Sequence, residues 1–86
     1  MTPRERLQLP VQWQDGARGW TRDISPEGAY VVVPGEHIVT RWCALEIGYV
    51  GRLRLRALAQ VLRLESLPEG LGIALHFHDV RIETTW

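Results

Sequence analysis

Residues 7–14 read Leu-Gln-Leu-Pro-Val-Gln-Trp-Gln, and the apolar side chains in this stretch alternate with polar ones. A period of two is typical of a β-strand that buries one face. Pro10 has no backbone N–H to donate, so this strand is expected to begin there or to lie at a sheet edge. Asp15-Gly16 is typical of a tight hairpin turn, which predicts an antiparallel return strand over 17–23.

Turn residues recur at short intervals along the rest of the chain, and the runs between them are rich in Val, Ile, Leu and aromatic residues. The later turns are Pro26-Glu27-Gly28, Pro34-Gly35, Gly48 to Gly51 and Pro68-Glu69-Gly70. This spacing predicts an all-β fold, a small antiparallel β-barrel of six to seven strands. Without a linker, a repeat or a low-complexity tract, residues 1–86 are expected to form a single domain.

The remaining strands are expected at 29–33, 41–47, 52–65 and 71–78. Within 52–65, residues 57–60 are also compatible with a helix. Strict alternation over 52–56 favours one long strand, and the change of phase at 57–60 predicts a β-bulge. The side chains expected to point inward from the strands at 41–47 and 71–78 are Cys43, Leu45, Ile47, Leu71, Ile73, Leu75 and Phe77; Gly72, Ala74, His76 and His78 are expected to point outward. Only eight residues follow His78, so a C-terminal helix is expected to be short or absent.

The charge and cysteine content exclude several classes of function. The formal net charge is zero, which argues against a small DNA- or RNA-binding barrel. All ten basic residues are arginine, which is compatible with codon bias or with recognition of phosphate and guanine edges. The single cysteine suits a reducing compartment, and no stretch resembles a signal peptide or a bilayer span. A cytoplasmic protein without membrane insertion is expected.

The segment Asp23-Ile24-Ser25-Pro26-Glu27-Gly28 lies between a polar strand and an apolar strand. Asp23 can accept hydrogen bonds from the N1–H and amino groups of a guanine, and Ser25 can donate to a phosphate or base acceptor. Gly28 provides either a positive φ or a close approach of the backbone. The alternative is an ordinary turn held by the Asp and Ser side chains.

This segment fits the D/N-x-S-x-x-G turn of the PilZ family, and the order of the predicted strands resembles that family over nearly the whole chain. The final strand, Gly72-Ile73-Ala74-Leu75-His76-Phe77, also has the family's pattern. The resemblance implies a β-barrel that binds cyclic di-GMP and relays its level to a protein partner.

The resemblance also implies an R-x-x-x-R motif ahead of the first strand, whose arginines bind the ligand. Arg6 matches the second arginine, but Thr2 stands where the first is expected; Arg4 is the candidate to replace it. Family members often place an arginine or tryptophan that stacks on guanine near the position of Arg63. The alternative for Arg63 is a solvated strand arginine. Arg52, Arg54 and Arg56 are expected on one face of the strand. This arginine stripe could attract phosphate or could be the solvent-exposed side of the sheet.

Other features give weaker signals. His76 and His78 share a strand face, and His37 could join them around a metal, but exposed strand histidines are the favoured interpretation. No arrangement of nucleophile and base and no phosphate-binding loop is present, so the chain is not expected to be an enzyme or to need a cofactor. Trp20 and Trp86 are candidates for partner contact.

Two functional hypotheses follow. In the first, the chain is a cyclic di-GMP receptor that uses Arg4, Arg6, Asp23, Ser25, Gly28 and Arg63. In the second, it is a degenerate PilZ-like protein-interaction module that does not bind nucleotide. Either could form a homodimer.

Overall fold

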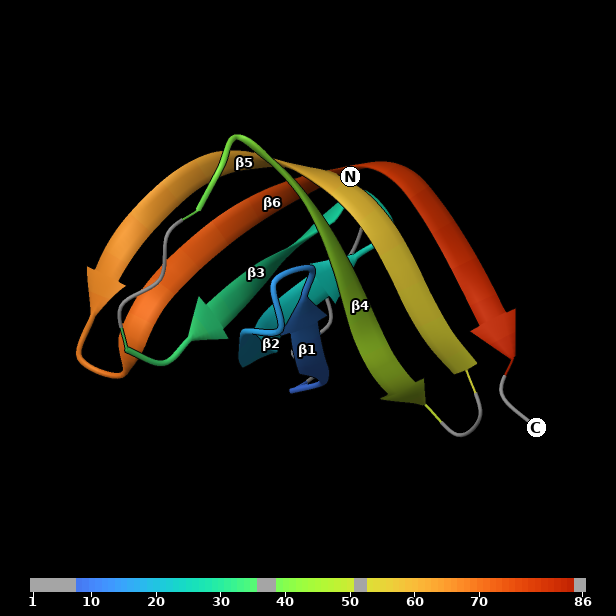
Figure 1. Cartoon of the computed structure of the whole chain (residues 1–86), viewed down its shortest axis with the longest axis horizontal. Coiled ribbons are helices and arrows are strands. Elements are labelled where there is room, and N and C mark those ends of the chain that lie inside the picture. Colours follow the sequence, from blue (N-terminus) through green and yellow to red (C-terminus); the bar gives the residue numbers. More distant parts are fainter. Residues whose placement is uncertain (1–7, 36–38, 51–52, 85–86) are drawn as a thin grey trace.

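A computed structural model describes residues 8–35, 39–50 and 53–84, which form six β-strands and no helix (Figure 1). The strands are β1 (Pro10–Trp13), β2 (Arg18–Ser25), β3 (Gly28–Val33), β4 (Trp42–Val50), β5 (Leu53–Leu67) and β6 (Gly70–Thr84). They close into an antiparallel barrel in the order β1-β2-β3-β6-β5-β4, with β1 pairing with β4. The predicted small all-β barrel is confirmed. None of the described residues forms a helix long and apolar enough to cross a membrane.

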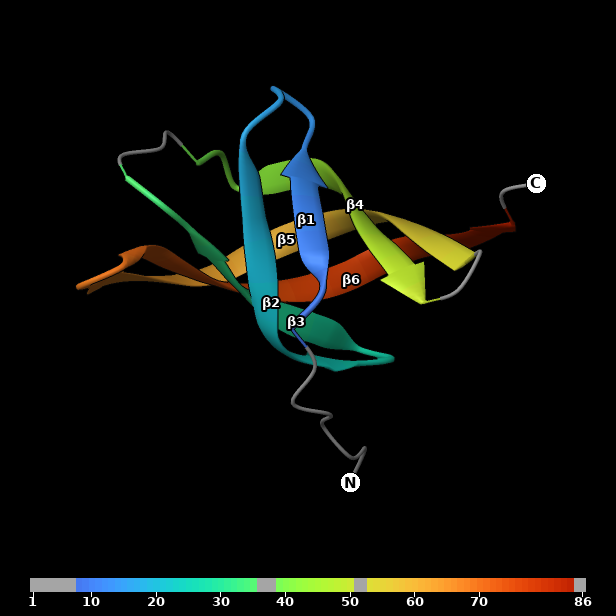
Figure 2. The same cartoon turned by 90° about the horizontal axis from the view of Figure 1, so that it is seen from below.

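β5 and β6 are the longest strands, with fifteen residues each, and they arch together over the shorter strands (Figures 1 and 2). Their register shifts between Leu58 and Ala59 and again between Val61 and Arg63. The first shift falls within the predicted bulge at 57–60. Bulges bend a strand and increase its twist, which lets one hairpin contribute to both sides of a small barrel.

The interior of the barrel contains the apolar side chains of the alternating pattern. The buried cluster consists of Val11, Trp13, Ala29, Val31, Val33, Cys43, Leu45, Ile47, Ala57, Ala59, Ile73, Leu75 and Phe77. The inward positions predicted for β4 and β6 are therefore confirmed, except that Leu71 is only half-buried. Gly72, which was expected to point outward, is buried because the Tyr30 hydroxyl lies over it.

β1 begins at Pro10, where the missing N–H allows a strand to start. The prediction that the last strand ends at His78 is wrong, because β6 continues to Thr84 and pairs with the first half of β5. The register shift leaves His78 as the extra residue between Phe77 and Asp79. The segment after His78, in which a short C-terminal helix was possible, therefore continues as part of β6.

Candidate functional site

Two of the predicted ligand residues lie in one cross-strand row on the outside of the barrel. Asp23 of β2 is opposite Tyr30 of β3, Tyr30 is opposite Ala74 of β6, and Ala74 is opposite Arg63 of β5. Directly paired residues in antiparallel strands point to the same face. The order of pairing therefore places Asp23 and Arg63 at the two ends of a four-strand row, which we call the first row.

A second row lies next to the first on the same face. Ser25 is opposite Gly28, and the row continues across β6, β5 and β4 through His76, Gln60 and Trp42. The inner positions of the two rows hold two small residues, Gly28 and Ala74, and two ring side chains, Tyr30 and His76. We call the two rows together the row face.

The Tyr30 ring is the main aromatic group of the first row. The Arg22 guanidinium carbon lies 5.5 Å from the centroid of this ring, and the Arg22 Nη2 is 3.1 Å from the Glu69 carboxylate. Burial, and then the nearby Glu65 charge, raise the pKa of the Tyr30 phenol. The phenol is therefore neutral at physiological pH, and the row face has no tyrosinate that would repel an anionic ligand.

Ser25 takes part in its own turn. Its Oγ accepts a hydrogen bond from the Glu27 backbone N–H at 3.3 Å and donates to the Gly28 carbonyl at 3.5 Å. The alternative of an ordinary serine turn is thus present in the structure. Both contacts are at the long end of hydrogen-bond distances, and the residue is only half-buried. A ligand oxygen could compete for the hydroxyl proton.

Gly28 is a site of close approach between strands. Its φ is not among the positive glycine angles, and a Cβ added to it would collide with the Leu75 carbonyl oxygen. Of the two roles expected for this glycine, the structure therefore supports the close backbone approach.

Gly28→Ala should lower the free energy of unfolding by about 1–3 kcal/mol, because the added methyl group must displace the β6 backbone. Gly48→Ala is the control, since a Cβ at Gly48 would be 3.7 Å from the Arg54 Cγ, an ordinary contact. Chemical denaturation of both variants checks the prediction. Equal stability of the two would show that β6 does not constrain Gly28.

Arg63 has an exposed side chain that also has a protein partner. Its Nε is 2.8 Å from the Glu65 Oε1, while 64% of its side-chain surface is accessible. An exposed ion pair of this kind is weak, typically about 0–1 kcal/mol. The guanidinium plane is therefore free to be recruited by a ligand at small cost.

Sequence reasoning missed the aromatic end of the second row. Trp42 is 45% exposed, and its ring centroid lies 4.6 Å from that of His78 in an edge-on arrangement. His78 contacts His76 at 5.0 Å between ring centroids, and its Nε2 is 3.2 Å from the Gln60 Oε1. The alternation of β4 indicates that Trp42 points away from Cys43, but only the strand register brings it to the histidines.

The other predicted contact residues have different outcomes. Trp20 is half-buried, which makes it a weaker partner anchor than the exposed Trp42. Arg4, Arg6, His37, Arg52 and Trp86 lie outside the described residues. The described residues contain no group of three or more potential metal ligands, although His76 and His78 do share a face.

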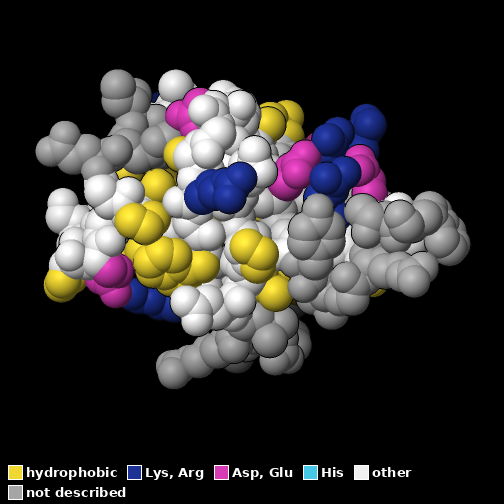
Figure 3. All heavy atoms as spheres, turned by 60° about the horizontal axis from the view of Figure 1, so that its bottom comes forward, with side chains coloured by type: hydrophobic (Ala, Val, Ile, Leu, Met, Phe, Trp, Pro, Cys, Tyr) yellow, Lys and Arg dark blue, Asp and Glu magenta, His cyan; other side chains and the backbone are white. Residues whose placement is uncertain are grey.

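The arginine stripe of β5 is part of an ionic cluster. Arg54 lies 3.3 Å from Glu46 and 2.9 Å from Glu83, and Arg56 lies 2.9 Å from Glu46. Figure 3 shows basic and acidic side chains side by side at one end of the molecule. The guanidinium groups of Arg54 and Arg56 therefore have carboxylate partners already, which makes this stripe a weaker phosphate site than its sequence suggests.

Glu83 should make stability depend on pH. The hydrogen bond from Arg54 lowers the pKa of Glu83 below its ordinary value of 4.5. A carboxylate with a lowered folded-state pKa contributes stability above its unfolded pKa, and this contribution is lost as pH falls through the folded pKa. Denaturation curves should therefore show a smaller loss of stability on acidification below about pH 5 for Glu83→Gln than for the wild type. Identical losses of stability on acidification in the two proteins would contradict this effect of the hydrogen bond between Arg54 and Glu83.

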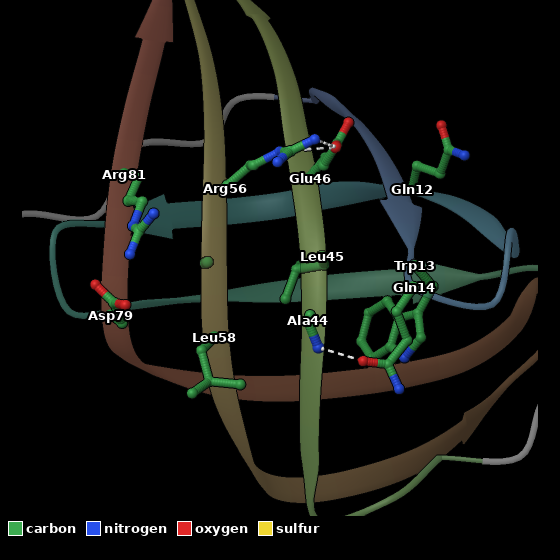
Figure 4. Close-up of a pocket in the computed structure, with 11 residues that line it drawn as sticks. Gln12, Trp13, Gln14, Ala44, Leu45, Glu46, Arg56, Leu58, Asp79 and Arg81 are labelled. Atoms are coloured by element: carbon green, nitrogen blue, oxygen red, sulfur yellow. Dashed lines mark hydrogen bonds and ion pairs between the residues drawn. The ribbon is translucent and has the colours of Figure 1, made fainter.

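Beside this cluster is a depression of about 430 Å³ lined by β1, β4, β5 and β6. Figure 4 shows Arg56 directed at Glu46 on one side, and on the other the Gln14 amide oxygen, which accepts a hydrogen bond from the Ala44 N–H at 2.9 Å. None of its lining residues belongs to the two rows of the row face. The depression and the predicted ligand residues are therefore separate features.

Cys43 is buried in the barrel, as predicted, and 1% of its surface is exposed. Burial raises the pKa of its thiol to about 11, so the thiolate is scarce at neutral pH. The native chain should therefore react with a thiol-specific disulfide reagent at pH 8 at least about 100-fold more slowly than the denatured chain. Equal rates would show that the barrel does not shield the thiol.

Comparison of the chain with protein-family models, with curated proteins and with solved structures gives no match.

Proposed function

We propose that this chain is a PilZ-like receptor that binds cyclic di-GMP on the row face and relays its level to a protein partner. The observation that supports the proposal is the gathering of Asp23, Ser25, Gly28 and Arg63 in two neighbouring rows of one outer face. These residues come from three strands, and they are four of the six ligand residues that the sequence resemblance implies.

The row face offers complementary groups to a ligand with two guanines and two phosphates. The Asp23 carboxylate can accept from the N1–H and amino group of one guanine, and Arg63 can stack on a base or pair with a phosphate. The two residues stand three inter-strand steps apart, roughly 14 Å. Between them stand Tyr30 and Ala74, and the small Ala74 side chain lets a ligand base lie close to the sheet beside Arg63.

Trp42 extends this surface. An exposed indole at the end of the second row can support a base by stacking, which is typically worth about 1–3 kcal/mol in proteins that bind single-stranded nucleic acid. In the proposal, Arg6 and Arg4 close over the ligand from the segment ahead of β1.

Backbone amide chemical shifts test the proposal directly. Titration of ¹⁵N-labelled chain with cyclic di-GMP should move the amide signals of 23–25, 27–28, 60–63 and 74–78, while signals around the 430 Å³ depression stay in place. GMP is the control ligand, because it has a single base and should bind more weakly. Shifts confined to the depression would place the ligand elsewhere and overturn the assignment to the row face.

A second candidate function is a PilZ-like interaction module that no longer binds nucleotide. Ser25 and Arg63 already have partners within the chain, and this favours the module. Here a protein partner would associate regardless of cyclic di-GMP, and its binding would fall with Trp86→Ala or Trp20→Ala. Unchanged association of both variants would remove these tryptophans from the interface.

A further inference from the structure

The second half of β6 has a sheet edge that the described strands leave unpaired. β3 pairs with β6 only as far as His76, and the Phe77 N–H reaches the Glu27 carbonyl at 2.8 Å. From Asp79 to Thr84, the described residues provide β6 with a partner on one side only, which is β5. A free edge presents a row of backbone donors and acceptors to any strand of matching chemistry.

This edge carries exposed apolar side chains. Ile82 is 69% exposed and Val80 is 40% exposed, and Leu53 lies close by on β5. All three residues are on the sheet face that elsewhere points into the barrel, since Val80 pairs with the buried Ala57 and Ile82 with the half-buried Leu55. An apolar strand edge of this kind is a site of association.

The outward side of the edge brings two arginines together, although the Arg81 charge also acts on Glu83, two residues away on β6. Arg81 is directly opposite Arg56, and like charges in this position are destabilising. Glu46 contacts Arg56, but the ion pairs formed among the described residues do not include Arg81. Arg81 is exposed at the free edge, so a carboxylate from a neighbouring strand could reach it.

We infer that a second copy of this chain adds to the β6 edge as an antiparallel strand, with a two-fold axis at Ile82. The face of each residue restricts the register, because paired residues must point to the same side of the sheet. An axis at Arg81 would place Arg81 against itself and Asp79 against Glu83 of the second copy. An axis at Val80 would bring the bulged His78 against Ile82, which points to the opposite face.

An axis at Ile82 avoids both conflicts. It pairs Ile82 with Ile82 of the second copy and Val80 with Thr84 of the second copy. It also pairs Arg81 of each copy with Glu83 of the other. The outer row would then run from Glu46 through Arg56 and Arg81 to Glu83 and Arg54 of the second copy. Arg81 gains a carboxylate directly opposite it, and a two-fold axis repeats the contact in both copies.

Sedimentation equilibrium between about 1 µM and about 1 mM tests the dimer, and Arg81→Glu is the informative variant. Within its own chain a glutamate at this position faces Arg56 and should preserve the fold, whereas across the axis it faces Glu83. The dissociation constant should rise by about 10- to 100-fold. The double charge swap Arg81→Glu with Glu83→Arg should restore association, because it exchanges the charges of both partners.

Cysteine cross-linking provides a measurement that does not need the charge variants to fold. Ile82→Cys should form an intermolecular disulfide under mild oxidation, because the two side chains face each other across the axis. Val80→Cys is the matched control and should not, since its opposite residue is Thr84; the native Cys43 is buried. The inference is overturned if the wild type stays monomeric over the whole range, if Arg81→Glu associates as tightly, or if Val80→Cys cross-links equally well.

Discussion

Asp23→Asn should weaken the binding of cyclic di-GMP by about 10- to 100-fold while the barrel stays folded. In the proposed complex the carboxylate accepts two hydrogen bonds from one guanine edge, whereas the NH2 group of an asparagine would face a guanine donor. A charge-assisted hydrogen bond is worth about 1.5–3 kcal/mol, which corresponds to this loss. Isothermal titration of both proteins under the same salt conditions measures it.

Arg18→Ala is the control for this experiment. Arg18 is on β2 as well, but it pairs with Gln12 and lies outside the two rows. Its removal changes the net charge without touching the row face, so affinity should stay within about twofold. Because the two changes alter the net charge in opposite directions, equal losses for Asp23→Asn and Arg18→Ala would indicate a general disturbance of the barrel and would contradict the site.

Leu75→Ala should have the largest effect on stability, a loss of about 2–5 kcal/mol in the free energy of unfolding. Leu75 is 3% exposed, and it lies in β6 between Ala29 of β3 and Val61 of β5. Neither neighbour is large enough to fill the space that its side chain leaves. Each kcal/mol should lower the melting temperature by about 4–8 °C in a domain of this size, which circular dichroism can follow.

Leu62→Ala is the matched control for Leu75→Ala. Leu62 is 63% exposed at the second register shift of the same hairpin, so its truncation should change stability by less than about 0.5 kcal/mol. Similar melting temperatures for the two variants would contradict the assignment of Leu75 to the interior.

The sequence predicted the barrel because apolar residues alternate strictly within short segments separated by turns. The change of phase at 57–60 predicted the bulge for the same reason. The extension of β6 was missed because the register shift leaves His78 without a partner residue on β5. The alternation over 71–77 breaks at that point, although it resumes from Val80 to Thr84.

The candidate site was only partly predictable. Asp23, Ser25 and Gly28 lie within one local turn, where the residue types and their spacing indicate a role. Trp42 and Gln60 join them only through strand pairing, and bulges in β2 and β5 decide which residues are opposite one another. No local pattern determines that register. The alternatives for Gly28 could likewise be separated only when the position of Leu75 was known.

Isothermal titration of cyclic di-GMP into the purified, folded wild-type chain tests the central claim most directly. The account predicts saturable binding at micromolar concentrations or below, and its loss with Asp23→Ala. The absence of heat at high ligand concentration, with a folded barrel confirmed by circular dichroism, would contradict the receptor and favour the protein-interaction module.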